Sequence, residues 1–241
     1  MCIRDSIVGV DLVRTGRDQF YVLEDNCRTP SGVSYMLENR EIMMKMFPDL
    51  FHSNRVQRVD DYPTRLLQTL MGLAPKKCDS SIPTVVLLTP GHLNSAYYEH
   101  TFLSDQMGIE MVEASDLYVE NDLVYMKTVD GPKKVDVIYR RIDDDYIDPL
   151  FYNPNSVIGI PGIIHAYRTG GVNICSAPGC GIADDKAIYI YVPEMIKFYL
   201  GEMPILENVE TWRCEKDDEL KYVLENIKNL VVKEVDGSGG Y

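Results

Sequence analysis

The chain has 241 residues, of which 45% are hydrophobic and 25% are charged, so it can bury a substantial core in one or two domains. Its formal net charge of −13 argues against nucleic acid and anionic membranes as partners, because both favour a basic surface. No segment approaches the roughly 20 apolar residues of a membrane span, and no secretory signal is visible. The six cysteines lack the paired spacing of zinc or redox sites, so we expect a cytoplasmic protein with reduced thiols.

A β-hairpin carrying oxygen ligands is predicted near the start of the chain. Residues 8–13 alternate between apolar and other side chains, and residues 20–23 form a second short β-prone segment after a turn. Glu24 and Asn26 share one face, and a suitable register places Asp11 opposite them. Two carboxylates and a carboxamide are suited to Mg²⁺. The alternative is an acidic hairpin end that faces solvent.

Two helical segments are expected to follow the hairpin. Apolar residues recur at helical spacing between 33 and 72, Pro48 interrupts them, and a further helix is expected near 62–73. The apolar face of the first helix includes the methionines at 43, 44 and 46, which are typical of core filling. A polar loop at 73–81 is the expected domain boundary.

The middle of the chain predicts a parallel α/β arrangement. A buried strand at 84–88, a helix at 95–107 and a strand at 109–112 form a β-turn-α-β unit of a doubly wound sheet. A hairpin over 117–127 and a strand at 135–139 follow. The sequence therefore indicates an α/β fold with some α+β elements.

The turn after the strand at 84–88 is a candidate ligand crevice, because open α/β sheets bind ligands at the carboxyl ends of strands. Asn94 is either a substrate contact or a cap for the next helix, and the two alternatives stay open. His92 is interpreted as part of the turn. The other histidines lack metal-type spacing and are interpreted as structural or surface residues: His52, His100 and His165.

Two arginines, Arg140 and Arg141, stand at the end of the strand at 135–139. Paired guanidinium groups can bind a carboxylate in bidentate fashion. The aspartates at 143–145 neutralise these arginines, bind a cation or merely solvate a loop, and the sequence leaves the three alternatives open.

The last quarter predicts a helix and a glycine-rich turn. Asp184 or Asp185 opens a helix that continues through Lys186 to about residue 200. Lys233 follows a predicted strand at 230–232 and precedes the glycines of the turn, which are Gly237, Gly239 and Gly240. A strand lysine and flexible amides suit phosphate, although no Walker signature is present. The alternative for the turn is a flexible tail.

These motifs together resemble those of a known family. The segment 9–32 resembles the metal-binding end of ATP-grasp ligases, and the segments 137–145, 179–186 and 192–195 are similar to the circularly permuted ATP-grasp family related to glutathionylspermidine synthase. In ordinary ATP-grasp enzymes the metal-binding motif follows the glycine-rich loop, whereas here it comes first. The resemblance implies a circularly permuted, ATP-grasp-like α/β fold with a doubly wound pre-ATP-grasp domain.

The resemblance also implies how the chain is organised. Residues 1–6 match no family pattern and are interpreted as a spurious start, and the chain is expected to be incomplete at both ends. Residues 7–75 would form the metal-binding part of the core, and 82–182 the pre-ATP-grasp domain. Residues 183–241 would begin the ATP clamp.

The resemblance assigns roles to individual residues. Mg²⁺ would be held by Asp11, Glu24 and Asn26. ATP would be contacted by Lys186, Lys233, Gly237, Gly239 and Gly240. Catalytic charge stabilisation would come from Arg28 and Arg141. Substrate would be bound by Ser31, Gly32, Asn94 and Arg140, with the helix-opening turn at 30–32 offering its amides to an acceptor carboxylate.

The implied activity is an ATP-dependent carboxylate–amine ligase that forms an acyl phosphate, which an amine then attacks. Positioning and charge neutralisation would do most of the catalytic work. The alternative is a non-catalytic or degenerate ATP-binding module that acts through protein partners, and a third hypothesis is an inactive fragment.

Overall fold

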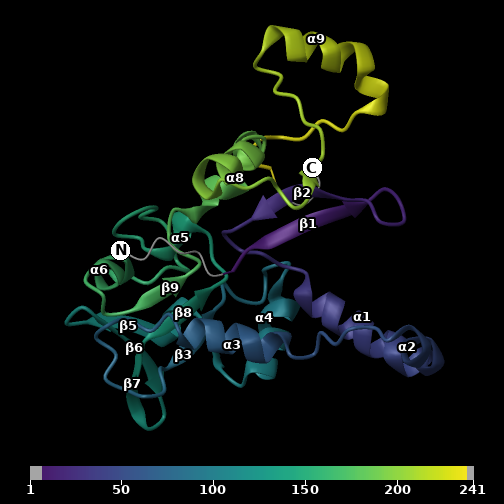
Figure 1. Cartoon of the computed structure of the whole chain (residues 1–241). Helices are drawn as coiled ribbons and strands as arrows, with labels where there is room; N and C mark the ends of the chain where they lie inside the picture. Colours follow the sequence, from purple (N-terminus) through teal and green to yellow (C-terminus); the bar gives the residue numbers. More distant parts are fainter. Residues whose placement is uncertain (1–6, 238–241) are drawn as a thin grey trace. The chain divides into compact units, whose positions relative to one another are not determined.

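The computed structural model describes residues 7–237, which form two compact units. Unit 1 contains Ile7 and residues 29–178, and unit 2 combines residues 8–28 with 179–237. Figure 1 follows the chain from the first strands in purple to the last helix in yellow. The expected functional segments 7–75, 82–182 and 183–241 stay a prediction. The expectations for residues 1–6, Gly239 and Gly240 lie outside the described residues.

Unit 1 is built on a parallel four-stranded sheet with the order β4-β3-β8-β9. The strands are β3 (Val85–Leu88), β4 (Glu110–Val112), β8 (Val137–Arg140) and β9 (Asn173–Cys175). The central strand β3 is buried throughout, and its alternate residues enter two separate apolar clusters, Val86 and Leu88 in one, Val85 and Leu87 in the other. Both faces of the sheet are therefore covered, as expected for parallel strands.

Different elements cover the two faces of this sheet. On one side, α3 (Tyr62–Met71) contributes Leu70 and α4 (Tyr97–Met107) contributes Leu103, both without solvent exposure. The other side carries α5 (Asp144–Ile147), α6 (Ile163–Arg168) and an antiparallel sheet of β5 (Leu117–Glu120), β6 (Leu123–Thr128) and β7 (Gly131–Val135). A short 3₁₀ helix, η1 (Ala114–Asp116), precedes β5. The predicted β-α-β unit and hairpin are confirmed, while β7 was not foreseen.

Two expectations for unit 1 need correction. The strand expected at 135–139 forms as β8 but begins at Val137, because β7 ends at Val135 and Asp136 stands between them. The Asp136 carboxylate accepts a hydrogen bond from the amide of Thr84 at 3.0 Å and pairs with Lys134 at 3.1 Å. The methionines at 43, 44 and 46 do not fill the core of the described structure. Their helix, α1 (Val33–Met46), leaves them 38, 50 and 63% exposed, and α2 (Pro48–Asn54) begins at the expected proline.

Unit 2 contains the predicted hairpin of β1 (Gly9–Arg14) and β2 (Phe20–Asn26). A two-residue strand, β10 (Glu207–Asn208), pairs in parallel with β2. The helices are α7 (Lys186–Tyr189), α8 (Val192–Leu200) and α9 (Asp217–Asn226), with 3₁₀ helices η2 (Cys180–Asp184) and η3 (Ile227–Asn229). Within residues 7–237, no helix combines the length and the apolar character that crossing a membrane requires.

Two expectations for unit 2 need correction. The single helix expected from about 184 to 200 is two helices, because Pro193 lacks the amide that would continue the ladder and instead stands in the first turn of α8. The strand expected at 230–232 does not form in the described structure. Leu230 is extended, but a strand needs a hydrogen-bonded neighbour, and the described residues provide none here.

Candidate functional site

The hairpin of unit 2 brings the three predicted metal ligands onto one face. The β1–β2 register pairs Asp11 with Glu24 and Gly9 with Asn26. A bulge follows Asp11, because Leu12 pairs with residue 22 and β2 carries one extra residue. Directly opposed residues point to the same side, and alternate residues share a face. The predicted register is confirmed, and the metal-binding role stays a proposal.

The electrostatics of this face suit a hard cation. Partial loss of hydration raises the pKa of Asp11, and repulsion by Glu24 raises it further, while Lys233 and a hydrogen bond from Asn26 act in the opposite direction. A divalent cation would relieve this repulsion between carboxylates. Among residues 7–237, no group of three or more His, Cys, Asp or Glu side chains could hold a metal ion. Mg²⁺ would therefore need the Asn26 oxygen and further ligands such as phosphate oxygens.

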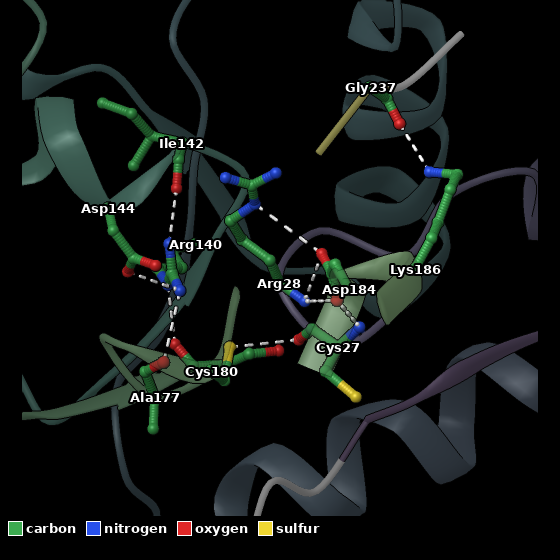
Figure 2. A network of polar contacts seen from close by, with 11 residues as sticks. Cys27, Arg28, Arg140, Ile142, Asp144, Ala177, Cys180, Asp184, Lys186 and Gly237 are labelled. Carbon is green, nitrogen blue, oxygen red and sulfur yellow. Dashed lines mark hydrogen bonds and ion pairs between the residues drawn. The ribbon is translucent and has the colours of Figure 1, made fainter. Parts of the chain in front are cut away.

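Two lysines from the far end of the chain meet Glu24. The Nζ atoms of Lys186 and Lys233 each lie 3.5 Å from Glu24 Oε2. Lys186 also donates from Nζ to the carbonyl oxygen of Gly237 at 2.6 Å, a contact visible in Figure 2, and from its backbone amide to Val235 at 3.1 Å. The structure thus brings both predicted phosphate-binding lysines, and the first glycine of the turn, to the predicted metal ligands.

Arg28 is held by a carboxylate of the same unit. Asp184 Oδ1 accepts hydrogen bonds from the backbone amides of Cys27 at 2.5 Å and Arg28 at 3.2 Å. The Arg28 guanidinium pairs with Asp184 through Nε at 3.6 Å. Cys180 donates from its thiol to the carbonyl oxygen of Cys27 at 3.3 Å. Figure 2 shows Asp184 facing both the amides and the guanidinium.

Arg141, in unit 1, lies in a buried ion pair that the sequence did not reveal. Its Nη2 atom is 3.0 Å from Glu99 Oε1, and each side chain is 1% exposed. Nη1 donates to Tyr139 Oη at 3.0 Å and to the carbonyl oxygen of Pro30. A catalytic role for Arg141 stays a prediction, and its described contacts join β8 to the turn before α1.

The amides expected to bind an acceptor carboxylate bind a carboxylate of the protein instead. Glu99 Oε2 accepts hydrogen bonds from the Gly32 amide at 2.7 Å, the Ser34 amide at 3.1 Å and the Ser34 hydroxyl at 3.0 Å. Gly32 has φ 103°, which favours glycine, and the neighbouring Ser31 is exposed. The amides at the start of α1 thus bind a carboxylate, and in this structure that carboxylate is Glu99. Substrate binding by Ser31 and Gly32 stays a prediction.

Arg140 connects several segments inside unit 1 through its guanidinium group. It is fully buried, it pairs with Asp144 at 2.9 Å, and it donates to the carbonyl oxygens of Ser176 at 2.6 Å and Ile142 at 2.7 Å. Figure 2 shows the guanidinium with Asp144 on one side and Ala177 on another. Of the alternatives for the aspartates, neutralisation of an arginine is confirmed for Asp144. Substrate binding by Arg140 stays a prediction.

The turn after β3 places Asn94 ahead of α4. Asn94 Oδ1 accepts a hydrogen bond from the amide of Ala96 at 2.9 Å, within the turn that precedes the helix. The N-cap of α4 is Ala96 and no side chain caps this helix, so the capping alternative was wrong, and substrate contact by Asn94 stays a prediction. His100 is buried, it shares a 2.9 Å hydrogen bond with Thr89, and burial together with the nearby Arg141 lowers its pKa to about 4. It is a structural histidine, as expected.

Sequence reasoning missed the roles of Glu99 and Asp184. An acidic residue in the first turn of a helix usually faces solvent or interacts with the helix dipole, so nothing local marks Glu99 as buried. Asp184 was considered only as a helix-opening residue. The actual N-cap of α7 is Asp185, whose side chain accepts a hydrogen bond from the Ala187 amide at 2.7 Å.

A hollow of unit 2 is separate from these residues. A cavity of about 480 Å³ is lined by α7, α8 and the segment around β10, including Tyr189, Pro193 and Val209. None of the residues assigned to metal, nucleotide or substrate lines it.

A protein-family model described as a circularly permuted ATPgrasp matches residues 3–241, which is nearly the whole chain. The chain belongs to the circularly permuted ATP-grasp family. Similar proteins include uncharacterized proteins of Synechocystis (52% identical over 235 residues, 98% of this chain and 48% of the relative) and of Mycobacterium tuberculosis (52% over 239 residues, 99% and 43%). A protein of Frankia casuarinae named "Putative glutamate--cysteine ligase 2-2" is 41% identical over 241 residues, which is 99% of this chain and 28% of that protein.

Family membership confirms the permuted order of motifs that the sequence indicated. ATP-grasp proteins generally bind ATP with Mg²⁺, and the family together with the Frankia name suggests an ATP-dependent ligase. The chain spans about half the length of the curated relatives from Synechocystis and M. tuberculosis. The activity, substrates and partners of the whole protein are therefore matters for proposal.

Proposed function

We propose that this chain provides the metal-binding and phosphate-binding residues of an ATP-dependent ligase that joins a carboxylate to an amine. The observation that carries the proposal is the meeting of four charged groups in unit 2. Asp11 and Glu24 stand opposite each other on the hairpin, and Lys186 and Lys233 approach Glu24 from segments far along the chain. Carboxylates for a cation beside lysines for phosphate are the pairing that metal-bound ATP requires.

The residues of this face fit the groups that they would hold. Asp11, Glu24 and Asn26 would hold Mg²⁺, which supplies charge neutralisation of the phosphates when bound. Lys186 and Lys233 would move from Glu24 to phosphate oxygens, because a metal ion on Glu24 competes with them for the same carboxylate oxygen. The amides around Gly237 would complete the phosphate contacts.

The reaction proposed for this site transfers the γ-phosphoryl group of ATP to a carboxylate, with ADP as the leaving group. The amine then attacks the acyl phosphate, phosphate departs, and a C–N bond forms. Arg28, anchored by Asp184, would stabilise the charge that develops on the transferring group. Binding of a substrate carboxylate by Arg141 and by the start of α1 is a separate proposal about unit 1 alone, in which the substrate would replace Glu99 on those groups.

A second candidate function is a non-catalytic ATP-binding module that acts through protein partners. The observation that favours it lies in unit 1. Glu99 pairs with Nη2 of Arg141 and accepts a hydrogen bond from the Gly32 amide, and Arg140 is fully buried, so these groups already have partners inside the protein. ATP binding without ADP production on any carboxylate and amine would support this candidate over the ligase.

The test uses the protein expressed from the longest reading frame that encodes these residues. Glu24→Ala is expected to abolish both ADP production and calorimetric binding of a Mg²⁺-bound, non-hydrolysable ATP analogue. Asp18→Ala is the matched control, since Asp18 is an exposed acid in the turn of the same hairpin. Full ADP production by Glu24→Ala would contradict the metal assignment. Loss of ADP production in both variants would show that any charge change in the hairpin is harmful.

A further inference from the structure

Asp184 stands at the point where the predicted metal ligands end. The strand β2 carries Glu24 and Asn26 and finishes at Asn26, and the next two backbone amides, those of Cys27 and Arg28, both donate to Asp184 Oδ1 at 2.5 and 3.2 Å. One carboxylate that receives two consecutive amides fixes the orientation of the peptide between them. It therefore fixes the direction in which the chain leaves the metal-binding face.

The same carboxylate also restrains the side chain of Arg28. Arg28 Nε lies 3.6 Å from Asp184 Oδ2, with the two side chains 34 and 17% exposed. The Arg28 amide reaches this second oxygen as well, at 3.3 Å. The backbone amide and the guanidinium thus face one acidic group, as Figure 2 shows, and the attraction between the two charges favours side-chain conformations that keep the guanidinium beside Asp184.

A further hydrogen bond links the residues after β2 to the 3₁₀ helix η2. Asp184 is the last residue of η2, and Cys180 at the other end of η2 donates from its thiol to the Cys27 carbonyl oxygen at 3.3 Å. The residues directly after Asp184 are Asp185, which caps α7, and Lys186, which reaches Glu24. The end of β2 and the start of α7 are therefore joined through Asp184.

Other roles for Asp184 fit the contacts less well. It is not the helix cap, because Asp185 accepts the capping hydrogen bond of α7. It is not placed as a cation ligand, because both of its oxygens already accept hydrogen bonds from amides or pair with Arg28.

We propose that Asp184 is a positioning residue that orients Arg28 toward the transferring phosphoryl group. This inference rests on the ligase function proposed above. Arg28 would act in the transition state and Asp184 only through Arg28. Loss of Asp184 should therefore lower kcat on the order of 10²-fold, as expected for a displaced charge-stabilising group, and leave KM for ATP nearly unchanged.

The experiment compares Asp184→Asn, Arg28→Lys and the double variant in the longest reading frame that contains these residues. Asp184→Asn keeps an acceptor oxygen for the two amides but loses the charge that pairs with Arg28. Asp18→Asn is the matched control, because it makes the same change at an exposed position of unit 2. Asp184→Glu keeps the charge on a longer side chain and is expected to recover part of kcat.

The kinetic outcomes separate positioning from stability. If Asp184 acts through Arg28, the two losses in kcat do not multiply in the double variant. Losses that multiply would overturn the inference, and so would a rise in KM for ATP at constant kcat. If Asp184→Asn does not fold, Asp184→Glu carries the test, and full kcat in that variant with a displaced carboxylate would also overturn it.

A ligand-free measurement keeps the inference distinct from the ligase function. The Nε–Hε resonance of Arg28, assigned by its loss in Arg28→Lys, is expected to shift in Asp184→Asn and to stay in place in Asp18→Asn. An unchanged resonance would refute the positioning role whatever the enzyme does. A shifted resonance in a protein that never produces ADP would support the contact and reject only the ligase proposal on which its catalytic meaning rests.

Discussion

Replacing Glu99 by alanine should strongly destabilise unit 1. The change removes the only described ion-pair partner of Arg141, and both side chains are 1% exposed. It also removes the acceptor of three hydrogen bonds, two from the amides of Gly32 and Ser34 and one from the Ser34 hydroxyl. Breaking a buried pair by removing one partner costs about 3–5 kcal/mol, because the remaining charge stays buried without compensation.

This cost is large against the total stability of a domain, which is about 5–15 kcal/mol. Ser34 is fully buried, so its amide and hydroxyl cannot turn to water when Glu99 is absent. Glu99→Gln should cost less than Glu99→Ala, because the carboxamide oxygen still accepts hydrogen bonds at the start of α1. It remains costly, because the Arg141 charge is left without its counter-charge.

The assay is urea unfolding followed by circular dichroism, with amide hydrogen exchange at residues 32–36 as a local readout. The double variant Glu99→Gln, Arg141→Met should be less destabilised than the two single variants added together, because neither charge is then stranded. Additive losses would refute the buried-pair interpretation. A loss below about 1 kcal/mol for Glu99→Ala would place the pair in the range of exposed ion pairs and refute its burial.

Two further predictions concern the stability of unit 1. Because burial, and to a smaller extent Arg141, lowers the pKa of His100 to about 4, the unfolded chain binds a proton that the folded chain does not between about pH 6.5 and 4. The free energy of unfolding should therefore decrease as the pH falls through that window, by up to about 1.4 kcal/mol per pH unit, and the urea midpoint should decrease with it. His100→Asn should make the free energy of unfolding less dependent on pH, and equal slopes for the two proteins would contradict the assignment of this slope to His100. Gly171→Ala should unfold the unit at lower urea than Gly170→Ala, since a Cβ at Gly171 would lie 1.8 Å from the Asp122 carbonyl oxygen, whereas at Gly170 it meets no atom within 4 Å and is opposed only by a φ of 74°. Equal urea midpoints for the two alanine variants would show that the loop at Asp122 can shift at little energetic cost.

Features set by residues close in sequence were predictable. The alternation in β1, the turn after it and the Glu24-x-Asn26 spacing are local, so they predicted the hairpin and its ligand-bearing face. The break at Pro48 and the β3-α4-β4 unit follow from the same kind of pattern. The family resemblance then supplied the link between this hairpin and the lysines, which no local pattern contains.

Features set by long-range packing were not predictable. Glu99 and Arg141 lie 42 residues apart, and nothing in either segment shows that they pair in the interior. The methionines of α1 fit a buried face as well as an exposed one, because hydrophobic periodicity does not say whether another element covers it. The expected strand at 230–232 shows the same limit, since strand propensity is realised only where a neighbouring strand supplies hydrogen bonds.

The permuted order places a particular demand on folding. Cys27 and Asp184 are separated by 157 residues, and the whole of unit 1 apart from Ile7 lies between the two segments that form unit 2. The contacts at Glu24 and Asp184 therefore close a long loop, which costs conformational entropy that only the completed unit repays. A single hydrogen bond would not offset the entropy cost of closing this loop. Several contacts link the two segments instead: the two amide hydrogen bonds to Asp184, the Cys180 thiol hydrogen bond and the two lysine ion pairs with Glu24. The residues that join the ends of unit 2 are thus the same ones that surround the proposed ATP site, so a substitution at this junction should affect assembly and chemistry together.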